Sequence, residues 1–231
     1  MEYTVLEGLL ARGEVDAVPP RALATLAEIA DGRRALLAVR HPLGFLCLPV
    51  QREGDLGVCV HLFNPWSAPW NGGAPVETER PTTSEVHCHS WDMTSVVLSG
   101  HVENTWMRVS DSTGPGEEPT HRVFEVHSSD GTDRIVPTDR VVRCAPARVE
   151  RSGPGQVYTL PAGEFHTSTV DDRTTAVTVV LGRARASRTD LSLGPLDAGS
   201  HVVDRRLCDR SETVRVAEAI AGRIHAAHAD L

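Results

Sequence analysis

The stretch SEVHCHSWDMTSVVLSG (residues 84–100) places His87 and His89 one residue apart at the start of a run rich in valine, threonine and serine. On a β-strand, residues i and i+2 project to the same face, so both imidazoles point together and Cys88 points away from them. We expect Gly100 to turn this strand back onto the next one as a hairpin. A chain with eleven histidines contains an HxH pair by chance on the order of half a time. The pair therefore needs independent support.

A second stretch, GPGQVYTLPAGEFHTSTV (residues 153–170), supplies that support. Gly155 is followed after five residues by Pro161, after one more by Gly163, and after two more by His166. Four specified residues at fixed offsets occur in a chain of this composition roughly once in two hundred trials. The turn before His166 would bring a distant strand alongside the first, so that three imidazoles converge inside a small barrel.

Together the two stretches resemble the two motifs of the cupin superfamily, over residues 43 to about 185. The first motif, G-x5-HxH-x3/4-E-x6-G, is matched by His87, His89 and Gly100, but Pro81 replaces its first glycine and Met93 its glutamate. The second motif, G-x5-P-x-G-x2-H-x3-N, is matched up to His166, and Val170 replaces its asparagine. The resemblance implies a double-stranded β-helix, or jelly-roll, barrel that holds a metal ion between its three histidines.

Three imidazoles on one face leave coordination positions open for substrate. Imidazole suits Fe(II), Zn, Ni, Cu and Mn, and Fe(II) is our first expectation. If Met93 occupies the acidic position, the divalent ion keeps its full charge and favours an anionic co-ligand. Among cupins this pattern is most similar to the three-histidine cysteine or thiol dioxygenases, although no cysteine lies near Met93 to form the Cys-Tyr cross-link that some members carry.

Four neighbouring residues are candidates for supporting roles. Asp92 is the rival fourth ligand, because a bulge would swing its carboxylate toward the metal. Glu85 shares the parity of His87 and is either a hydrogen-bond partner for a ligand imidazole or a solvent-exposed strand end. Trp91 borders the ligands and either lines the substrate pocket or packs in the wall. Tyr158 either donates a proton or orients substrate, or packs in the core.

Further residues are given a place from the sequence. Trp66 and Trp70 form a loop that either shields the barrel mouth or makes a plug or dimer contact. Arg80 and Arg108 are possible carboxylate clamps, and Trp106 is expected in the barrel wall. The other eight histidines receive no assigned role. The five cysteines include no CxxC pair, so buried free thiols are expected rather than a disulfide framework or a zinc ribbon.

The pattern of apolar residues predicts one all-β domain with helical arms. Residues 1–40 are an N-terminal helical arm, residues 43–195 the barrel, and residues 211–230 a C-terminal helix packed on it. That last helix is expected to begin at Ser211 as N-cap and to cover the barrel with three residues four apart, namely Val216, Ile220 and Ile224.

Composition excludes several classes of protein. A net charge of −8 with scattered arginines argues against nucleic acid or anionic membrane as partners. No segment approaches a membrane span and the N-terminus is acidic, so we expect a cytoplasmic protein. All 23 Lys and Arg residues are arginine, which excludes mechanisms that need a lysine.

Three hypotheses for function follow. The first is an Fe(II)-dependent dioxygenase or oxygenase acting on a small, anionic, metal-chelating molecule. The second is a non-redox lyase or isomerase in which the metal polarises a carbonyl or enolate. The third is a ligand-binding cupin without turnover. In each case we expect a homodimer.

Overall fold

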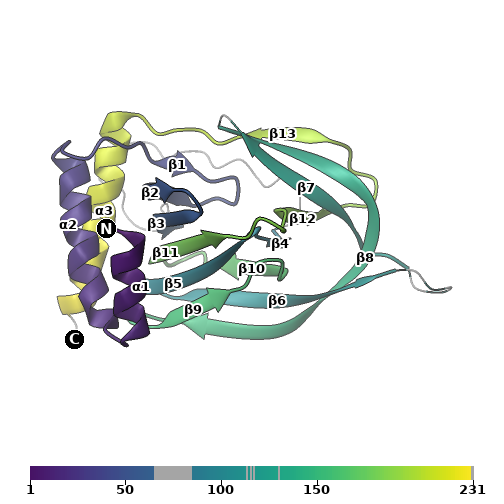
Figure 1. Cartoon of the computed structure of the whole chain (residues 1–231), viewed down its shortest axis with the longest axis horizontal. Helices are drawn as coiled ribbons and strands as arrows, with labels where there is room; N and C mark the ends of the chain where they lie inside the picture. Colours follow the sequence, from purple (N-terminus) through teal and green to yellow (C-terminus); the bar gives the residue numbers. More distant parts are fainter. Residues whose placement is uncertain (65–84, 113, 115, 117, 130, 230–231) are drawn as a thin grey trace.

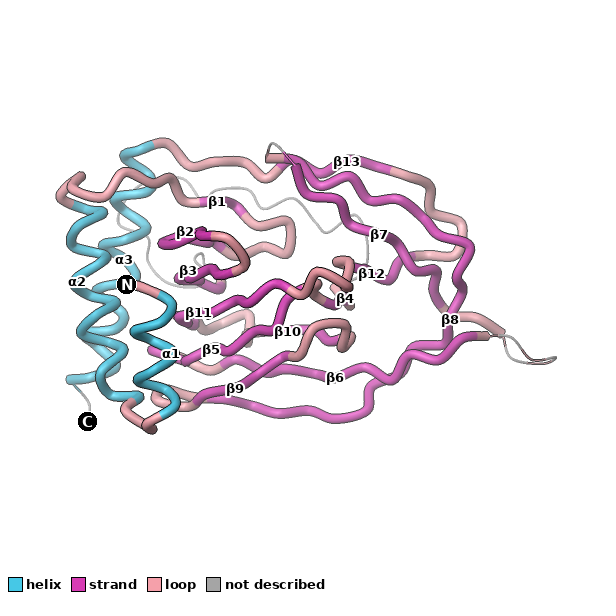
Figure 2. Tube along the Cα trace, viewed as in Figure 1, coloured by secondary structure: helices cyan, strands magenta, loops and turns pink. Residues whose placement is uncertain are grey.

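We describe the protein from a computed structural model, in which the described residues are 1–64, 85–112, 114, 116, 118–129 and 131–229. Within them the chain is mostly β, with the helices gathered at one end of the strands (Figure 1 and Figure 2). The helices are α1 (Tyr3–Ala11), the short 3-10 helix η1 (Val15–Ala17), α2 (Val18–Ala30) and α3 (Arg210–Ala229). None of the described helices is both long and apolar enough to cross a bilayer.

The strands form two antiparallel sheets, which together give an all-β barrel. The six-stranded sheet has the order β1 (Val39–Arg40), β2 (Leu46–Glu53), β3 (Leu56–Phe63), β11 (Ala176–Ala184), β5 (Trp91–Ser99), β9 (Val157–Leu160). The seven-stranded sheet has the order β13 (His201–Asp204), β8 (Thr132–Ser152), β6 (Val102–Asp111), β10 (His166–Thr169), β4 (His87–Cys88), β12 (Leu191–Gly194), β7 (His121–Ser129). The predicted all-β fold with helical ends is confirmed.

Strand β3 explains why the six-stranded sheet lies between two cores. Val58, Val60 and Leu62 belong to the core shared with the helices, whereas Cys59 and Phe63 belong to the core inside the barrel. Because side chains alternate between the faces of a strand, one apolar run supplies both cores. The helices thus close one face of this sheet, and the other face is free to line a site.

Strand β8 shapes the seven-stranded sheet. Its 21 residues pair with β7 along the first part and with β6 along the second (Figure 1). The sequence of neighbours β8, β6, β10, β4, β12 and β7 therefore closes into a ring. A third apolar core lies within this region and includes Cys88, Val123 and Leu193. Cys88 is buried there, away from the barrel interior, as the alternation of side chains predicts.

The hairpin predicted at Gly100 is wrong. Strands β5 and β6 flank Gly100, yet they belong to different sheets and do not pair with each other. Gly100 has a φ of 73°, and a Cβ there would overlap the carbonyl oxygen of Thr175. Only glycine meets both conditions, so this turn carries the chain from one sheet to the other.

The helical ends also differ in detail from the prediction. The N-terminal helices end at Ala30, and Val39–Arg40 already pair with β2. Strand β13 lies beyond residue 195, where the β region was expected to stop. Val216, Ile220 and Ile224 are buried in the core under the helices, as predicted.

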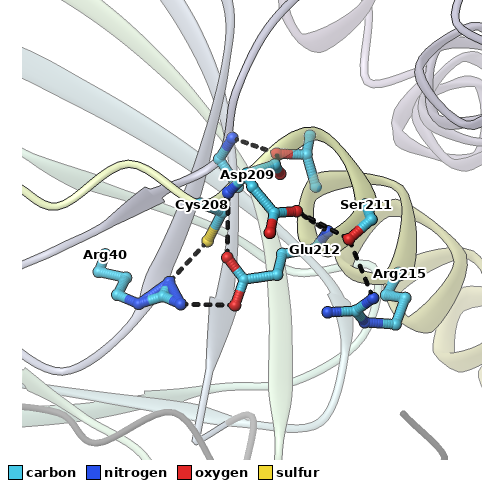
Figure 3. A network of polar contacts seen from close by, with 8 residues as sticks. Arg40, Cys208, Asp209, Ser211, Glu212 and Arg215 are labelled. Atoms are coloured by element: carbon cyan, nitrogen blue, oxygen red, sulfur yellow. Dashed lines mark hydrogen bonds and ion pairs between the residues drawn. The ribbon is translucent and has the colours of Figure 1, made fainter. Parts of the chain in front are cut away.

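The N-cap predicted at Ser211 is wrong, because Asp209 has that role (Figure 3). The Asp209 carboxylate accepts a hydrogen bond from the Glu212 amide at 2.8 Å, and the Glu212 carboxylate accepts one from the Asp209 amide at 3.0 Å. This reciprocal pair is a capping box. Arg40 donates to the Glu212 carboxylate at 2.8 Å and to the Cys208 sulfur at 2.9 Å, which ties the start of α3 to β1.

Candidate metal centre

Three histidines converge at the junction of two short strands. His87 lies on β4, His89 follows it directly, and His166 opens β10 in register opposite His87. The ring centroids are 4.8 Å apart for His87 and His89, 4.6 Å for His87 and His166, and 5.1 Å for His89 and His166. One ring nitrogen from each lies within 4.8 Å of the others. The convergence predicted from the two motifs is therefore present, and the group can hold a divalent metal ion.

The second nitrogen of two of these rings is already engaged. His87 Nδ1 lies 2.8 Å from the main-chain oxygen of Glu85, and His166 Nδ1 lies 2.9 Å from that of Glu164. A carbonyl can only accept, so each Nδ1 carries the proton and each Nε2 keeps its lone pair. The Nε2 of His166 is buried and has no hydrogen-bond partner in the part of the chain that the structure describes. Buried polar atoms normally have a partner, and a metal ion would provide one here.

The three imidazoles are held in the neutral form that metal binding requires. Burial lowers the pKa of His166 to about 3, and it also lowers the pKa of His87 and His89. Mutual repulsion between the rings adds to this effect for His89 and His166. Protons therefore do not compete with a cation at this site near neutral pH.

Among the residues that the structure describes, no carboxylate belongs to this group of ligands. Asp92 accepts a hydrogen bond from the Ala162 amide at 2.9 Å and is paired with Arg185, and the Ala162 bond is the largest cause of its lowered pKa. Met93, which stands at the glutamate position of the motif, is buried in the barrel core. Glu85 has an exposed side chain, and only its main-chain oxygen reaches His87.

Aromatic rings form the wall beside the histidines. Trp91 packs against His89 with ring centroids 4.3 Å apart. A Cβ at Gly182 would come within 2.8 Å of the Trp91 ring, so glycine makes room for the indole. Trp106 lies opposite His166 in the β6–β10 register and carries the Arg148 guanidinium 3.9 Å above its ring centre. Trp91 thus covers one side of His89, and Trp106 is the strand neighbour of His166.

Tyr158 is buried in the barrel interior on β9. Burial raises the pKa of its hydroxyl to about 12, against the opposing influence of the nearby Ser95 and Asn104 side chains. The phenol is therefore protonated near neutral pH. Its role in proton transfer stays a prediction.

Several residues proposed from sequence lie elsewhere. Arg108 is exposed on β6. Its role as a clamp stays a prediction. Trp66, Trp70, Arg80 and Pro81 lie outside the described residues.

The sequence reading missed a second group of ligand-type side chains, formed by Cys47, Cys59 and His61. Cys59 and His61 are two residues apart on β3, and the same i, i+2 spacing had singled out His87 and His89. A single Cys-x-His pair does not by itself indicate a metal site, and the third ligand-type residue, Cys47, comes from the neighbouring strand.

Comparisons with known proteins add little. No family model matches the chain, and no curated protein matches it. Among solved structures, a conserved protein of unknown function, SPY1581 from Streptococcus pyogenes, is 13% identical over 62% of this chain and 76% of its own, with a TM-score of 0.31. Hydroxypropylphosphonic acid epoxidase from S. wedmorenis is 12% identical over 60% of this chain, with a TM-score of 0.31. This chain spans only 50% of the epoxidase. The two sheets and the histidine group fit a cupin-like fold.

Proposed function

We propose that the protein is a mononuclear non-haem Fe(II) oxygenase, most similar in pattern to the dioxygenase-like cupins, that acts on a small anionic chelating molecule. The observation that carries this proposal is a group of three neutral imidazoles in which, among the described residues, no carboxylate takes part and the buried His166 Nε2 has no hydrogen-bond partner. His87, His89 and His166 are the ligands in this proposal. An ion held by three neutral donors keeps its positive charge, so an anionic substrate such as a thiolate, enolate or carboxylate complements it.

The chain's own residues would prepare the site in three ways. The carbonyls of Glu85 and Glu164 fix the rings of His87 and His166 through their Nδ1 protons. Burial keeps the imidazoles neutral, as their lowered pKa values indicate. The indole of Trp91 covers one side of His89 and excludes water there. When bound, Fe(II) would supply open coordination positions for substrate and dioxygen.

A non-redox lyase or isomerase is the second candidate, and the buried Tyr158 favours it. Its hydroxyl is protonated near neutral pH, because burial raises its pKa to about 12. In this candidate it would be the proton donor to an enolate that a metal stabilises. Such a reaction needs no dioxygen. Oxygen dependence therefore separates the two candidates.

The experiment is a screen of small thiols, hydroxy acids and diketones with Fe(II)-loaded protein, measured by oxygen consumption and by loss of each compound under air and under argon. We expect turnover only under air, and a loss of at least about 100-fold in His166→Ala, because removing a ligand exceeds the 10–100-fold effect of losing an outer partner. His127→Ala is the matched control, since His127 is exposed and pairs with Glu125, away from the three-histidine group. Turnover under argon would instead support the lyase or isomerase.

A further inference from the structure

Cys47, Cys59 and His61 form a separate cluster inside the barrel, on strands β2 and β3. Cys47 lies directly opposite His61 in the antiparallel register, and Cys59 is two residues before His61 on the same face. The two sulfur atoms and one imidazole nitrogen all lie within 4.8 Å of one another. Both cysteines are buried, with 7% and 9% of their surface exposed. Buried cysteines usually pack as small apolar side chains. Here three ligand-type side chains meet in one apolar core instead.

The strand register argues against a disulfide between these cysteines. Cys47 and Cys59 are diagonal neighbours on adjacent strands, because Cys47 faces His61 and Cys59 faces Pro49. Diagonal neighbours have Cα atoms about 7–8 Å apart, whereas a disulfide requires about 4.4–6.8 Å. The sulfurs can approach a common point between the strands without the backbone being placed for an S–S bond.

The surroundings of the cluster limit water and place a cation beside one of the two thiols. The Arg52 guanidinium donates to the Cys59 sulfur at 3.8 Å. The hydrogen bond from Cys47 lowers the pKa of Cys59, and His61 and Arg52 add to this effect, whereas the same bond and burial raise the pKa of Cys47. A metal ion that binds both sulfurs would therefore displace the Cys47 proton. The ring of Phe45 lies 4.7 Å from that of His61, and the ring of Phe63 lies 6.0 Å from it. Thiolate is the form of cysteine that binds metal.

We propose that Cys47, Cys59 and His61 form a second metal site, specific for a thiophilic cation such as Zn²⁺. Two thiolates and one imidazole hold zinc in tetrahedral geometry with a fourth position open for water or another ligand. Soft thiolate ligands also select against the hard cations that oxygen ligands prefer. This site does not depend on the proposed oxygenase activity, because it shares no ligand with the three-histidine group.

The two sites share one interior and are electrostatically compatible. Cys47 and Cys59 belong to the apolar core against which Trp91 packs, and Trp91 also packs against His89, so one core reaches both groups. Two thiolates carry two negative charges and balance a divalent cation. Occupation of the cysteine site therefore adds little net charge beside the three histidines, and both sites can be filled together.

The test is an anaerobic titration of reduced, metal-free protein with Co²⁺, followed by absorption spectroscopy. Cobalt replaces zinc in tetrahedral sites and gives a near-ultraviolet thiolate-to-metal charge-transfer band, which a site made only of histidines cannot produce. We expect the band to saturate at one Co²⁺ per chain and to disappear when Zn²⁺ is added. The His166→Ala variant, which removes a ligand from the other site, should keep the band.

Substitutions locate the ligands. We expect Cys47→Ser and Cys59→Ser each to weaken Co²⁺ binding by more than about 100-fold, beyond the usual effect of losing an outer partner. Cys88→Ser is the matched control, because Cys88 is also buried but lies in another core. Circular dichroism establishes that each variant is folded. A folded wild-type protein without the band in excess Co²⁺ would overturn the proposal. So would a band that survives in both Cys47→Ser and Cys59→Ser, or a Cys47–Cys59 disulfide that persists under reducing conditions.

Discussion

At the scale of single residues, the state of each ring nitrogen decides what the site can do. His87 and His166 donate Nδ1 protons to main-chain carbonyls two residues earlier in the chain. This i−2 arrangement positions the Nε2 lone pairs without using any other side chain. The sequence had suggested the Glu85 carboxylate for that role, but its main-chain oxygen fulfils it. The sequence therefore suggested that Glu85 accepts a hydrogen bond from a ligand imidazole, but not that the accepting atom is its main-chain oxygen.

The lowered pKa of His166 predicts how the stability of the metal-free protein depends on pH. An unfolded histidine takes up a proton below about pH 6.5, whereas folded His166 stays neutral down to about pH 3. The unfolded state then binds more protons, so stability is complete above pH 6.5 and falls as the pH drops from 6.5 toward 3. At pH 5.5 the loss from this residue is about 1.4 kcal/mol.

Urea unfolding of chelator-treated protein at pH 7.5 and pH 5.5 measures this effect. The wild-type protein should lose about 1 kcal/mol more than His166→Gln between the two pH values. Equal losses in both proteins would show that His166 is not held neutral by burial.

The sequence predicted the three-histidine group because its signals are local. An i, i+2 pair on a strand and a Pro-x-Gly turn before a histidine each fix directions over a few residues. The cluster of Cys47, Cys59 and His61 was missed because its third member comes from another strand. No local spacing reveals which residue a neighbouring strand places opposite His61.

At the scale of elements, the turn from β5 to β6 determines how the sheets are joined. The alternation of side chains predicted both strands but not that they pair with different partners. The odd or even position of a residue along a strand shows which face of the sheet its side chain occupies. It does not show which strand pairs with that strand. The passage between sheets depends on Gly100 and its contact with Thr175.

Two glycine substitutions separate two destabilising effects of an added Cβ. One is the steric clash at Gly100, and the other is the strain of a positive φ angle. Gly100 and Gly155 have similar φ angles, 73° and 76°, but only Gly100 is crowded, since a Cβ at Gly155 would meet nothing within 4 Å. Gly155→Ala should lower the unfolding free energy by about 1–2 kcal/mol, and Gly100→Ala by a further 1–3 kcal/mol, roughly. Chemical denaturation tests the order, and equal losses would contradict the crowding.

The start of α3 gives a second prediction at this scale. Asp209 accepts the Glu212 amide, whereas Ser211 only donates its hydroxyl to Asp209. Asp209→Ala should therefore lower the melting temperature more than Ser211→Ala, because it leaves a helix N–H unpaired. Thermal unfolding followed by circular dichroism measures both variants. A larger fall in melting temperature for Ser211→Ala than for Asp209→Ala would indicate that Ser211 is the N-cap, as the sequence had suggested.

At the scale of the whole molecule, β8 joins strands β7 and β6 into one sheet, and no local sequence pattern predicts this. Most of its residues are partly or fully exposed, and it contains two prolines, Pro137 and Pro146, so its sequence does not resemble one long strand. Its length follows from pairing with β7 and then with β6. The general barrel was therefore predictable, whereas the ring of strands around the site was not.

We expect the protein to form a homodimer, and edge strand β13 is a suitable place for contact. Val202 on this strand is 61% exposed, and an exposed apolar edge strand favours pairing with another chain. Val202→Arg should therefore shift the protein toward monomer in sedimentation velocity measurements. A wild-type protein that sediments at its chain mass of 25.0 kDa would contradict this expectation.

We propose that His87, His89 and His166 share one iron ion that has a vacant coordination position. Electron paramagnetic resonance of anaerobic, Fe(II)-loaded protein exposed to nitric oxide tests it most directly, because nitric oxide binds only where a coordination position is open. We predict the signal of a high-spin iron–nitrosyl adduct at one per chain, which His166→Ala abolishes and His127→Ala keeps. Iron bound at one per chain without this signal, or a signal that persists in His166→Ala, would contradict the account.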